Sequence, residues 1–177
     1  MQRKTEEVNM RIDLGEDRID ISTGDDILDH LLETLFFYME EKVEIEAEWD
    51  LRHHLWEDMG ILLGKVLKEK IDEKEIQRFG NAIIPMDDAL VLASVDISRI
   101  YLEMNLDSEY GEEGFDGALV REFLNGVSRN LSATIHLKKL SGRNSHHVIE
   151  AGFKALGVAL SRAVERSDGL KSTKGVL

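Results

Sequence analysis

The chain has 177 residues, of which 42% are hydrophobic and 32% charged, as expected of a globular protein with a sizeable core. Its formal net charge of −13 argues against nucleic acid and anionic membrane surfaces as partners. The absence of cysteine excludes disulfides and thiolate metal sites, and no apolar run approaches the ~18 residues of a membrane helix. The amino-terminal residues lack the pattern of a signal peptide, so we expect a cytoplasmic protein.

Hydrophobic periodicity predicts alternating strands and helices in the first half of the chain. Asp25 or Asp26 is expected to cap the first helix, which ends near Glu40. The turn residues Gly15-Glu16-Asp17 predict that the two strands beside them form a hairpin. The predicted elements are strands at 3–14, 18–22 and 43–49 and helices at 25–40 and 53–71.

The second half predicts a similar order. Extended segments are expected at 77–86 and 89–96, around Pro85, the only proline, and a polar, glycine-rich loop at 108–117. The remaining predicted elements are strands at 99–107 and 133–137, a helix at 119–131, a turn at 141–144 and a helix from there to about 166.

One stretch of the chain occurs twice, at 53–67 and at 146–160. Both copies begin with His-His, continue with Glu three residues later, and share a Leu-Gly pair and a final Leu. Apolar residues at helical spacing make each copy an amphipathic helix. An internal duplication of this kind predicts two pseudo-symmetric halves.

We therefore predict an α/β fold, an α+β sandwich in which each half runs strand-strand-helix-strand-helix. The chain is expected to form a single domain over residues 1–177, with repeat halves at approximately 1–86 and 87–177. No low-complexity segment or flexible linker separates these halves.

The polar residues of the repeat are types that bind metal ions. In a helix, residues three and four apart share a face, so each glutamate lies near both histidines of its copy. Adjacent histidines point about 100° apart, so two neighbouring ions would take one each more easily than one ion would take both. Imidazole and carboxylate ligands suit divalent Mn, Fe, Co, Ni or Zn. The candidate ligands are His53, His54 and Glu57 in the first copy and His146, His147 and Glu150 in the second.

Two further histidines lie one short element before a His-His helix. His30 is in the predicted helix 25–40 and His136 is in the predicted strand 133–137. A lone histidine often has a structural role, but this placement favours ligation. Six histidines and two glutamates would give each of two ions three imidazoles and one carboxylate, which leaves open positions for a substrate.

An ordered set of short motifs runs through nearly the whole chain. They are Arg3-x-Thr5-x-Glu7, Leu28-Asp29-His30, His53-His54-x-x-Glu57-Asp58, Arg78-Phe79-Gly80, Pro85-Met86-Asp87-Asp88-Ala89-Leu90, Asp96-Ile97-Ser98-Arg99, His136, Gly142-x-Asn144-x-His146-His147-x-x-Glu150 and Ser172-Thr173-Lys174-Gly175. In this set the chain resembles the imidazoleglycerol-phosphate dehydratase family of histidine biosynthesis.

The resemblance implies a role for individual residues. The eight histidines and glutamates above match the family's ligands for two Mn²⁺ ions, and Glu7 matches its proposed acid–base residue. The family's phosphate-binding set is matched by Arg78, Arg99, Lys154, Ser172 and Lys174. The resemblance also implies a homo-oligomer, in which trimers assemble into a 24-subunit shell with active sites between subunits.

The reaction implied is that of a hydro-lyase, which dehydrates imidazoleglycerol phosphate to imidazoleacetol phosphate. The carbon that loses its proton has no carbonyl beside it, so a base alone would not suffice. Two cations on the ring nitrogens would favour imidazolate, whose electrons expel the hydroxyl on the ring-attached carbon. A diazafulvene-like intermediate would then have an acidic neighbouring C–H, and Glu7 would move that proton.

The chain departs from the family pattern at several positions, as a divergent member would. Leu51-Arg52 replaces two aspartates that would orient ligand imidazoles, so a different metal affinity is expected. The turn Ser98-Arg99-Ile100 is one residue shorter than usual, which affects the placement of Arg99. The other departures are Val8, Asp25-Asp26, Thr34 and Leu55. No ligand residue is lost.

Other functions remain open from the sequence. A non-catalytic, metal-binding assembly paralogue would keep the ions, although it would need neither Glu7 nor a phosphate clamp. A dinuclear metal phosphoesterase would favour ions bridged by aspartates that activate water. Without the resemblance, Glu7 also reads as an exposed strand carboxylate and the phosphate-binding cations as solvated surface groups.

Overall fold

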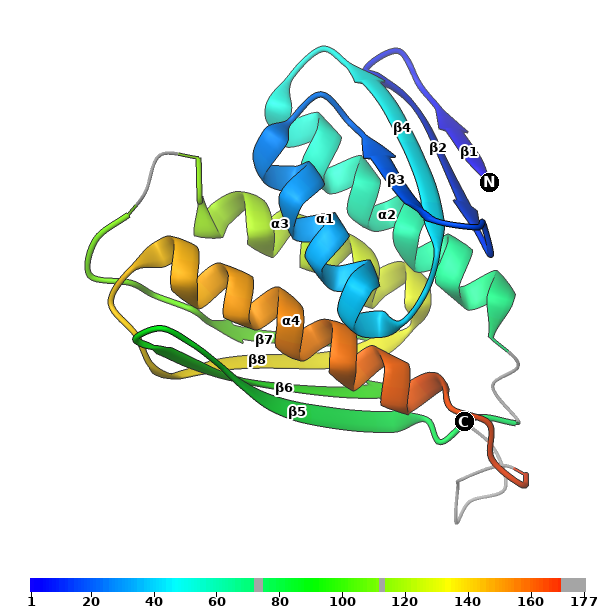
Figure 1. The fold of residues 1–177 in the computed structure, drawn as a ribbon. Coiled ribbons are helices and arrows are strands. Elements are labelled where there is room, and N and C mark those ends of the chain that lie inside the picture. Colours follow the sequence, from blue (N-terminus) through cyan, green and yellow to red (C-terminus); the bar gives the residue numbers. More distant parts are fainter. Residues whose placement is uncertain (72–74, 112–113, 170–177) are drawn as a thin grey trace.

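A computed structural model describes residues 1–71, 75–111 and 114–169, and this part of the chain forms two four-stranded sheets and four helices (Figure 1). The strands are β1 (Gln2–Lys4), β2 (Val8–Leu14), β3 (Ile19–Ser22), β4 (Val43–Trp49), β5 (Phe79–Met86), β6 (Ala89–Ile97), β7 (Tyr101–Asn105) and β8 (Ala133–Ser141). The helices are α1 (Asp26–Met39), α2 (Arg52–Lys70), α3 (Gly117–Leu131) and α4 (Ser145–Val164).

The two sheets share one topology. Their strand orders are β1-β2-β4-β3 and β5-β6-β8-β7. β2 and β6 are antiparallel to both of their neighbours, whereas the β3–β4 and β7–β8 pairs are parallel. In each half a helix, α1 or α3, connects the parallel strands, as parallel pairing requires. The α/β class and the two pseudo-symmetric halves are confirmed. Each half has one strand more than the strand-strand-helix-strand-helix order, because the predicted strand 3–14 forms two strands and the predicted segment 77–86 belongs to the second sheet.

The hairpin predicted around Gly15-Glu16-Asp17 is wrong. Gly15 does turn the chain, with φ of +84°, but β3 then pairs in parallel with β4, where Ile19 lies opposite Val43. The predicted strand 3–14 is interrupted at residues 5–7, which separate β1 from β2. β5 pairs with β6 and therefore belongs to the second sheet. The two sheets of the structure are thus divided between Lys70 and Phe79, whereas the sequence suggested a division near residue 86.

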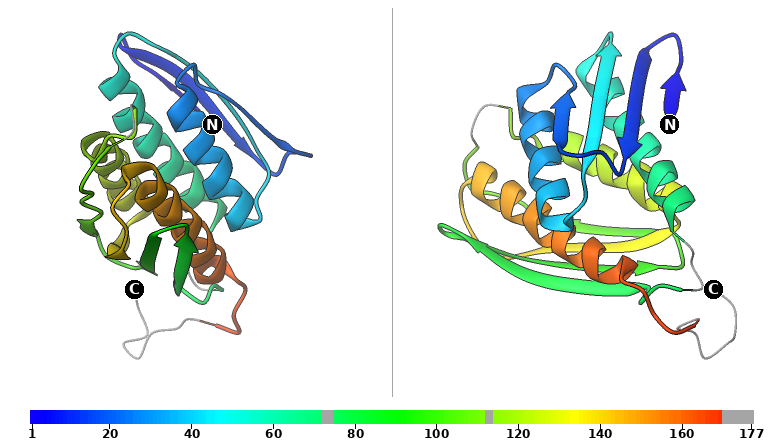
Figure 2. Two further views of the ribbon diagram at one scale, coloured as in Figure 1. Left: turned by 60° about the vertical axis from the view of Figure 1, so that its left-hand side comes forward. Right: turned by 45° about the vertical axis from the view of Figure 1, so that its right-hand side comes forward.

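The helices lie between the two sheets (Figures 1 and 2). α1 and α2 pack on the first sheet and α3 and α4 on the second, while α1 crosses α4 and α2 crosses α3. The glycines of the repeated Leu-Gly pairs lie at these crossings. A Cβ added to Gly157 would lie 2.6 Å from the carbonyl oxygen of Leu35, and one added to Gly64 would lie 2.8 Å from Asn130 Cβ. The repeated glycines therefore lie where helices of opposite halves approach closely.

Alternate strand residues that face the helices form the buried core, as Val91, Ala93 and Val95 of β6 illustrate. The opposite, outward face of the second sheet exposes large apolar side chains, among them Phe79, Ile83, Tyr101 and Leu140. Within the described ranges, none of the helices has the length and apolar character needed to cross a lipid bilayer.

All four helices begin on the same side of the molecule, at the left of Figure 1. The Asp25 carboxylate caps α1 by accepting hydrogen bonds from the backbone N–H of Ile27 and Leu28, both at 3.1 Å. The side chain of Asn144 caps α4 through the N–H of His146 at 2.8 Å. The His-His pairs of both repeat copies therefore lie at helix starts on one side of the fold.

Candidate metal centre

Three predicted ligands converge where α1 crosses α4. The Nε2 atoms of His30 and His146 both lie 2.9 Å from Oε2 of Glu150. His146 and Glu150 are four residues apart on α4 and share a face, while α1 brings His30 to them. Among the described residues this is the one group of three ligand residues whose ligand atoms all lie within 4.8 Å of one another.

Glu150 is the anionic centre of this cluster. Its side chain is 10% exposed, and its Oε1 lies 2.8 Å from Nζ of Lys154, one helical turn further on. Burial by itself would raise the pKa of Glu150, but the hydrogen bonds from Lys154 and His30 outweigh that effect and lower the pKa to about 2. Glu150 is therefore a carboxylate at neutral pH.

An aromatic ring covers one side of the cluster. Phe115 stacks on His146 with 4.2 Å between ring centroids and 20° between ring planes. His30 meets the same imidazole edge-on, at 6.0 Å. The orientation of His146 is thus set by Phe115 and Glu150 together.

In the first repeat copy, His54 lies between two carboxylates. Its Nδ1 donates to Oδ1 of Asp50 at 2.7 Å, and its Nε2 lies 3.8 Å from Oε1 of Glu7. The bond to Asp50 raises the pKa of His54 and lowers that of Asp50. With the Nδ1 proton held by Asp50, Nε2 is the nitrogen available to a metal ion. His53 lies beside this ring, at 4.1 Å between centroids, and Glu57 is exposed.

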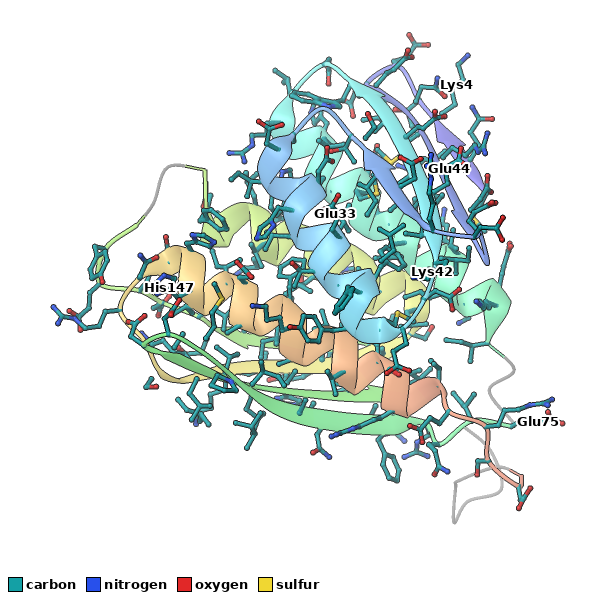
Figure 3. All side chains as sticks on the ribbon, in the orientation of Figure 1. Lys4, Glu33, Lys42, Glu44, Glu75 and His147 are labelled. Atoms are coloured by element: carbon teal, nitrogen blue, oxygen red, sulfur yellow. The ribbon has the colours of Figure 1, made fainter. Side chains whose placement is uncertain are left out.

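In the second copy, His147 has an equivalent environment at the start of α4 (Figure 3). Its Nδ1 donates to Oδ1 of Asp88 at 2.7 Å, which lowers the pKa of that carboxyl, and its Nε2 lies 3.6 Å from Asp87. Both aspartates belong to the turn between β5 and β6, just as Glu7 belongs to the connection between β1 and β2. The pseudo-symmetry of the fold therefore extends to the carboxylates beside Nε2, Glu7 and Asp87, whereas the Nδ1 partners Asp50 and Asp88 come from different places in the two halves.

Two carboxylates that orient histidines of the predicted ligand set were not identified from the sequence. We expected Leu51-Arg52 to leave the first His-His pair without one, but Asp50 supplies it from one residue earlier. Its position four residues before His54 was the available signal. Asp88 gave no comparable signal, because its contact with His147 spans 59 residues.

Glu7 lies on a short bend held by its own motif. Oγ1 of Thr5 accepts from the backbone N–H of Glu7 and Val8, both at 3.1 Å. Arg3 forms an ion pair at 2.6 Å with Asp58, which is 8% exposed and lies on α2. The Arg3-x-Thr5-x-Glu7 motif thus fixes the backbone that presents Glu7 to His54.

His136 lies on the outward face of the second sheet. It sits between the buried residues Ile135 and Leu137 of β8, whose side chains face the helices, and its ring is 5.5 Å from that of Tyr101. The sheet therefore separates His136 from the cluster on α4. A single chain does not bring all eight predicted ligands together.

The predicted phosphate-binding residues are also spread out. Lys154 joins the metal cluster and contacts Sδ of Met86, at one end of β5. Arg78 precedes the other end of β5 and donates to Oδ1 of Asp96 at 2.8 Å, and Arg99 is exposed. The two remaining members, Ser172 and Lys174, lie outside the described residues.

The donor set fits a divalent transition metal. Two imidazole nitrogens directed at one buried carboxylate oxygen form a nitrogen and oxygen site with no sulfur ligand. Manganese, iron, cobalt, nickel and zinc all accept such ligands, so this donor set does not select among them.

Comparisons with known proteins identify the family. A model of the family described as imidazoleglycerol-phosphate dehydratase matches residues 23–160. An imidazoleglycerol-phosphate dehydratase of Pyrococcus furiosus is 52% identical over 100% of both chains. One from Dictyoglomus thermophilum is 45% identical over 99% of this chain and 96% of its own.

Solved structures give the same result. The crystal structure of the Pyrococcus furiosus protein in complex with (S)-C348 superposes with a TM-score of 0.96, at 51% identity over 100% of both chains. The imidazoleglycerol-phosphate dehydratase of Staphylococcus aureus superposes with a TM-score of 0.81, at 36% identity over 94% of this chain and 98% of the other.

Proposed function

This chain belongs to the imidazoleglycerol-phosphate dehydratase family, a family of hydro-lyases in histidine biosynthesis, and from that premise we propose that it converts imidazoleglycerol phosphate to imidazoleacetol phosphate with two Mn²⁺ ions. The observation that carries the metal dependence is the convergence of His30, His146 and Glu150.

The eight predicted ligands would hold the ions. When bound, the two ions would supply positive charge at the substrate's ring nitrogens, which favours imidazolate and departure of the hydroxyl from the ring-attached carbon. Asp50 and Asp88 orient His54 and His147 for this task by accepting their Nδ1 protons. Beyond the cluster, the proposed ligands are His53, His54, Glu57, His136 and His147.

Glu7 is the proposed acid–base residue. The hydroxyl would leave as water with the proton that the ring gives up in forming imidazolate, and Glu7 would then take the proton from the carbon next to the ring-attached carbon. The resulting enol rearranges to the ketone. The Glu7 carboxylate lies 3.8 Å from Nε2 of His54, and this contact with a proposed ligand supports its role as the base.

We further propose that each site is built from several copies of the chain. His136 and the His146 cluster lie on opposite sides of the second sheet, so a site that uses both takes them from different copies. The same holds for the phosphate, because the length of β5 separates Arg78 from Lys154. The exposed apolar side chains around His136 suit a surface that another copy covers. Trimers that associate into a 24-subunit shell are the proposed assembly.

The test is a turnover assay on metal-free protein supplied with Mn²⁺ and imidazoleglycerol phosphate. The proposal expects imidazoleacetol phosphate to form with Mn²⁺ and not without metal. Bound Mn²⁺ and an intact assembly without product would instead identify a non-catalytic paralogue. Release of inorganic phosphate would identify a phosphoesterase.

A further inference from the structure

An ion pair outside the proposed ligand set joins the starts of α1 and α2, between a buried Asp25 and an Arg52 whose side chain is 37% exposed. Nε and Nη2 of Arg52 donate to the two carboxylate oxygens of Asp25, at 2.5 and 3.2 Å. Trp56 Nε1 donates to the same carboxylate at 3.1 Å. The Asp25 side chain is 5% exposed and also caps α1. One carboxylate therefore caps α1 and holds two side chains of the first turns of α2.

The guanidinium also reaches the segment before α3. Arg52 Nη2 donates to the carbonyl oxygen of Gly114 at 3.2 Å. Gly114 lies so close to α1 that an added Cβ would come within 2.8 Å of Ile27 Cγ1. The next residue is Phe115, whose ring stacks on His146. Contacts thus lead from Arg52 to all three helices that carry proposed ligands.

Both members of the pair are ionised at neutral pH. Burial alone would raise the pKa of Asp25, but the hydrogen bonds from Arg52 and Trp56 outweigh it and lower that pKa. The bond to Asp25 raises the pKa of Arg52. Removing Arg52 would leave the buried Asp25 carboxylate without its charged partner, which favours a single geometry for the intact pair.

We propose that Asp25 and Arg52 are positioning residues, which set the spacing between the His30–His146–Glu150 cluster and the His53–His54 pair for the bound ions. This inference rests on the metal site of the proposed function. The direction in which Mn²⁺ affinity changes when Arg52 is lost separates positioning from electrostatics. The positive charge of Arg52 repels cations, so its loss alone would tighten Mn²⁺ binding. Loss of positioning weakens that binding instead.

The experiment measures Mn²⁺ affinity by calorimetry on folded, metal-free Arg52→Gln and Asp25→Asn. Asn at position 25 keeps the helix cap, so that variant removes mainly the charge. Each variant is expected to lose about tenfold in affinity, as is usual for groups that orient metal ligands. Their double variant should lose no more than either single one, because both changes break the same contact. Arg52→Lys keeps the charge without the forked geometry and replaces Arg52→Gln if the latter does not fold.

The matched control is the ion pair Glu41–Lys70, at 2.6 Å, which joins the far ends of the same two helices. Glu41→Gln and Lys70→Gln should leave Mn²⁺ affinity within twofold of the unaltered protein. Unchanged or tighter binding by Arg52→Gln, or an equal loss in Lys70→Gln, would overturn the positioning role alone. If the unaltered protein bound no Mn²⁺, the proposed metal site would fail as well.

Discussion

Among the single residues, Glu7, the proposed acid–base residue, is held in place by its neighbours. Thr5 fixes its backbone, and its carboxylate faces His54. Glu7→Gln keeps the size of the side chain but removes the base, so turnover should fall by about 10²–10⁴-fold, the usual contribution of a positioned acid–base group. Mn²⁺ content should be unchanged, because Glu7 is not a proposed ligand. Steady-state rates and elemental analysis on the same preparation check both, and a rate like that of the unaltered protein would remove Glu7 from the mechanism.

Two departures from the family pattern meet in one contact. Departures were expected from the sequence at Asp25 and at Arg52, and these two side chains form the ion pair described above. Both residues can be seen in the sequence, but their contact could not be predicted from it, because Asp25 and Arg52 are 27 positions apart.

This ion pair makes stability depend on pH. The pKa of Asp25 is lowered in the folded state, so its carboxylate stabilises the fold above the unfolded-state pKa of about 3.9, and that contribution is lost as the pH falls through the folded-state pKa. Asp25→Asn should unfold at lower urea concentration than the unaltered protein at pH 7, with the difference shrinking below about pH 4. The control is Asp26→Asn, because Asp26 is the exposed neighbour of Asp25. A difference independent of pH would contradict the assignment.

At the scale of elements, periodicity predicted all four helices, and the structure differs by only a few residues at their ends. The partner of β3 was mispredicted because Gly15-Glu16-Asp17 is a valid turn signal, and turn chemistry is local. The pairing is decided by α1, whose apolar face has to cover the sheet, and that long-range packing is absent from the turn itself. The two pseudo-symmetric halves were predicted correctly because both copies of the repeat can be seen in the sequence itself.

The crossing of α2 and α3 depends on Gly60. A Cβ there would lie 2.1 Å from the carbonyl oxygen of Phe123, which is backbone and cannot rotate away. Gly60→Ala should therefore lower the free energy of unfolding by about 1–3 kcal/mol or more, the typical cost of overpacking. Urea denaturation of metal-free protein at fixed concentration measures it.

The control for that measurement is Gly117→Ala at the start of α3, where the nearest atom to an added Cβ is Met104 Cε at 4.0 Å. This variant should be as stable as the unaltered protein or slightly more so, since alanine favours helix. Equal stability of both variants would show that α2 and α3 are not in close contact.

At the scale of the whole molecule, the repeat predicts ligands in symmetric places but not which of them meet. His30 and Glu150 touch across 120 positions, whereas His136 faces away from both. Only the arrangement of the sheets and helices decides this. It is also the reason why a site with all eight ligands requires more than one copy of the chain.

Sites shared between copies should allow complementation. His136→Ala and His146→Ala are each expected to be inactive alone. Mixed assemblies should regain activity, up to about a quarter of the sites with random mixing of copies. Unfolding and refolding the two variants together, with mass spectrometry of the intact assemblies to prove mixing, makes the measurement. Mixed but inactive assemblies would show that no site draws these two histidines from different copies.

We propose that the doubled His-His-x-x-Glu pattern, together with His30 and His136, holds a pair of ions that the dehydration requires. The most direct measurement is elemental analysis and turnover on one sample of assembled protein. We predict two manganese ions per chain together with conversion of imidazoleglycerol phosphate. Full turnover with one ion or none per chain would contradict the claim.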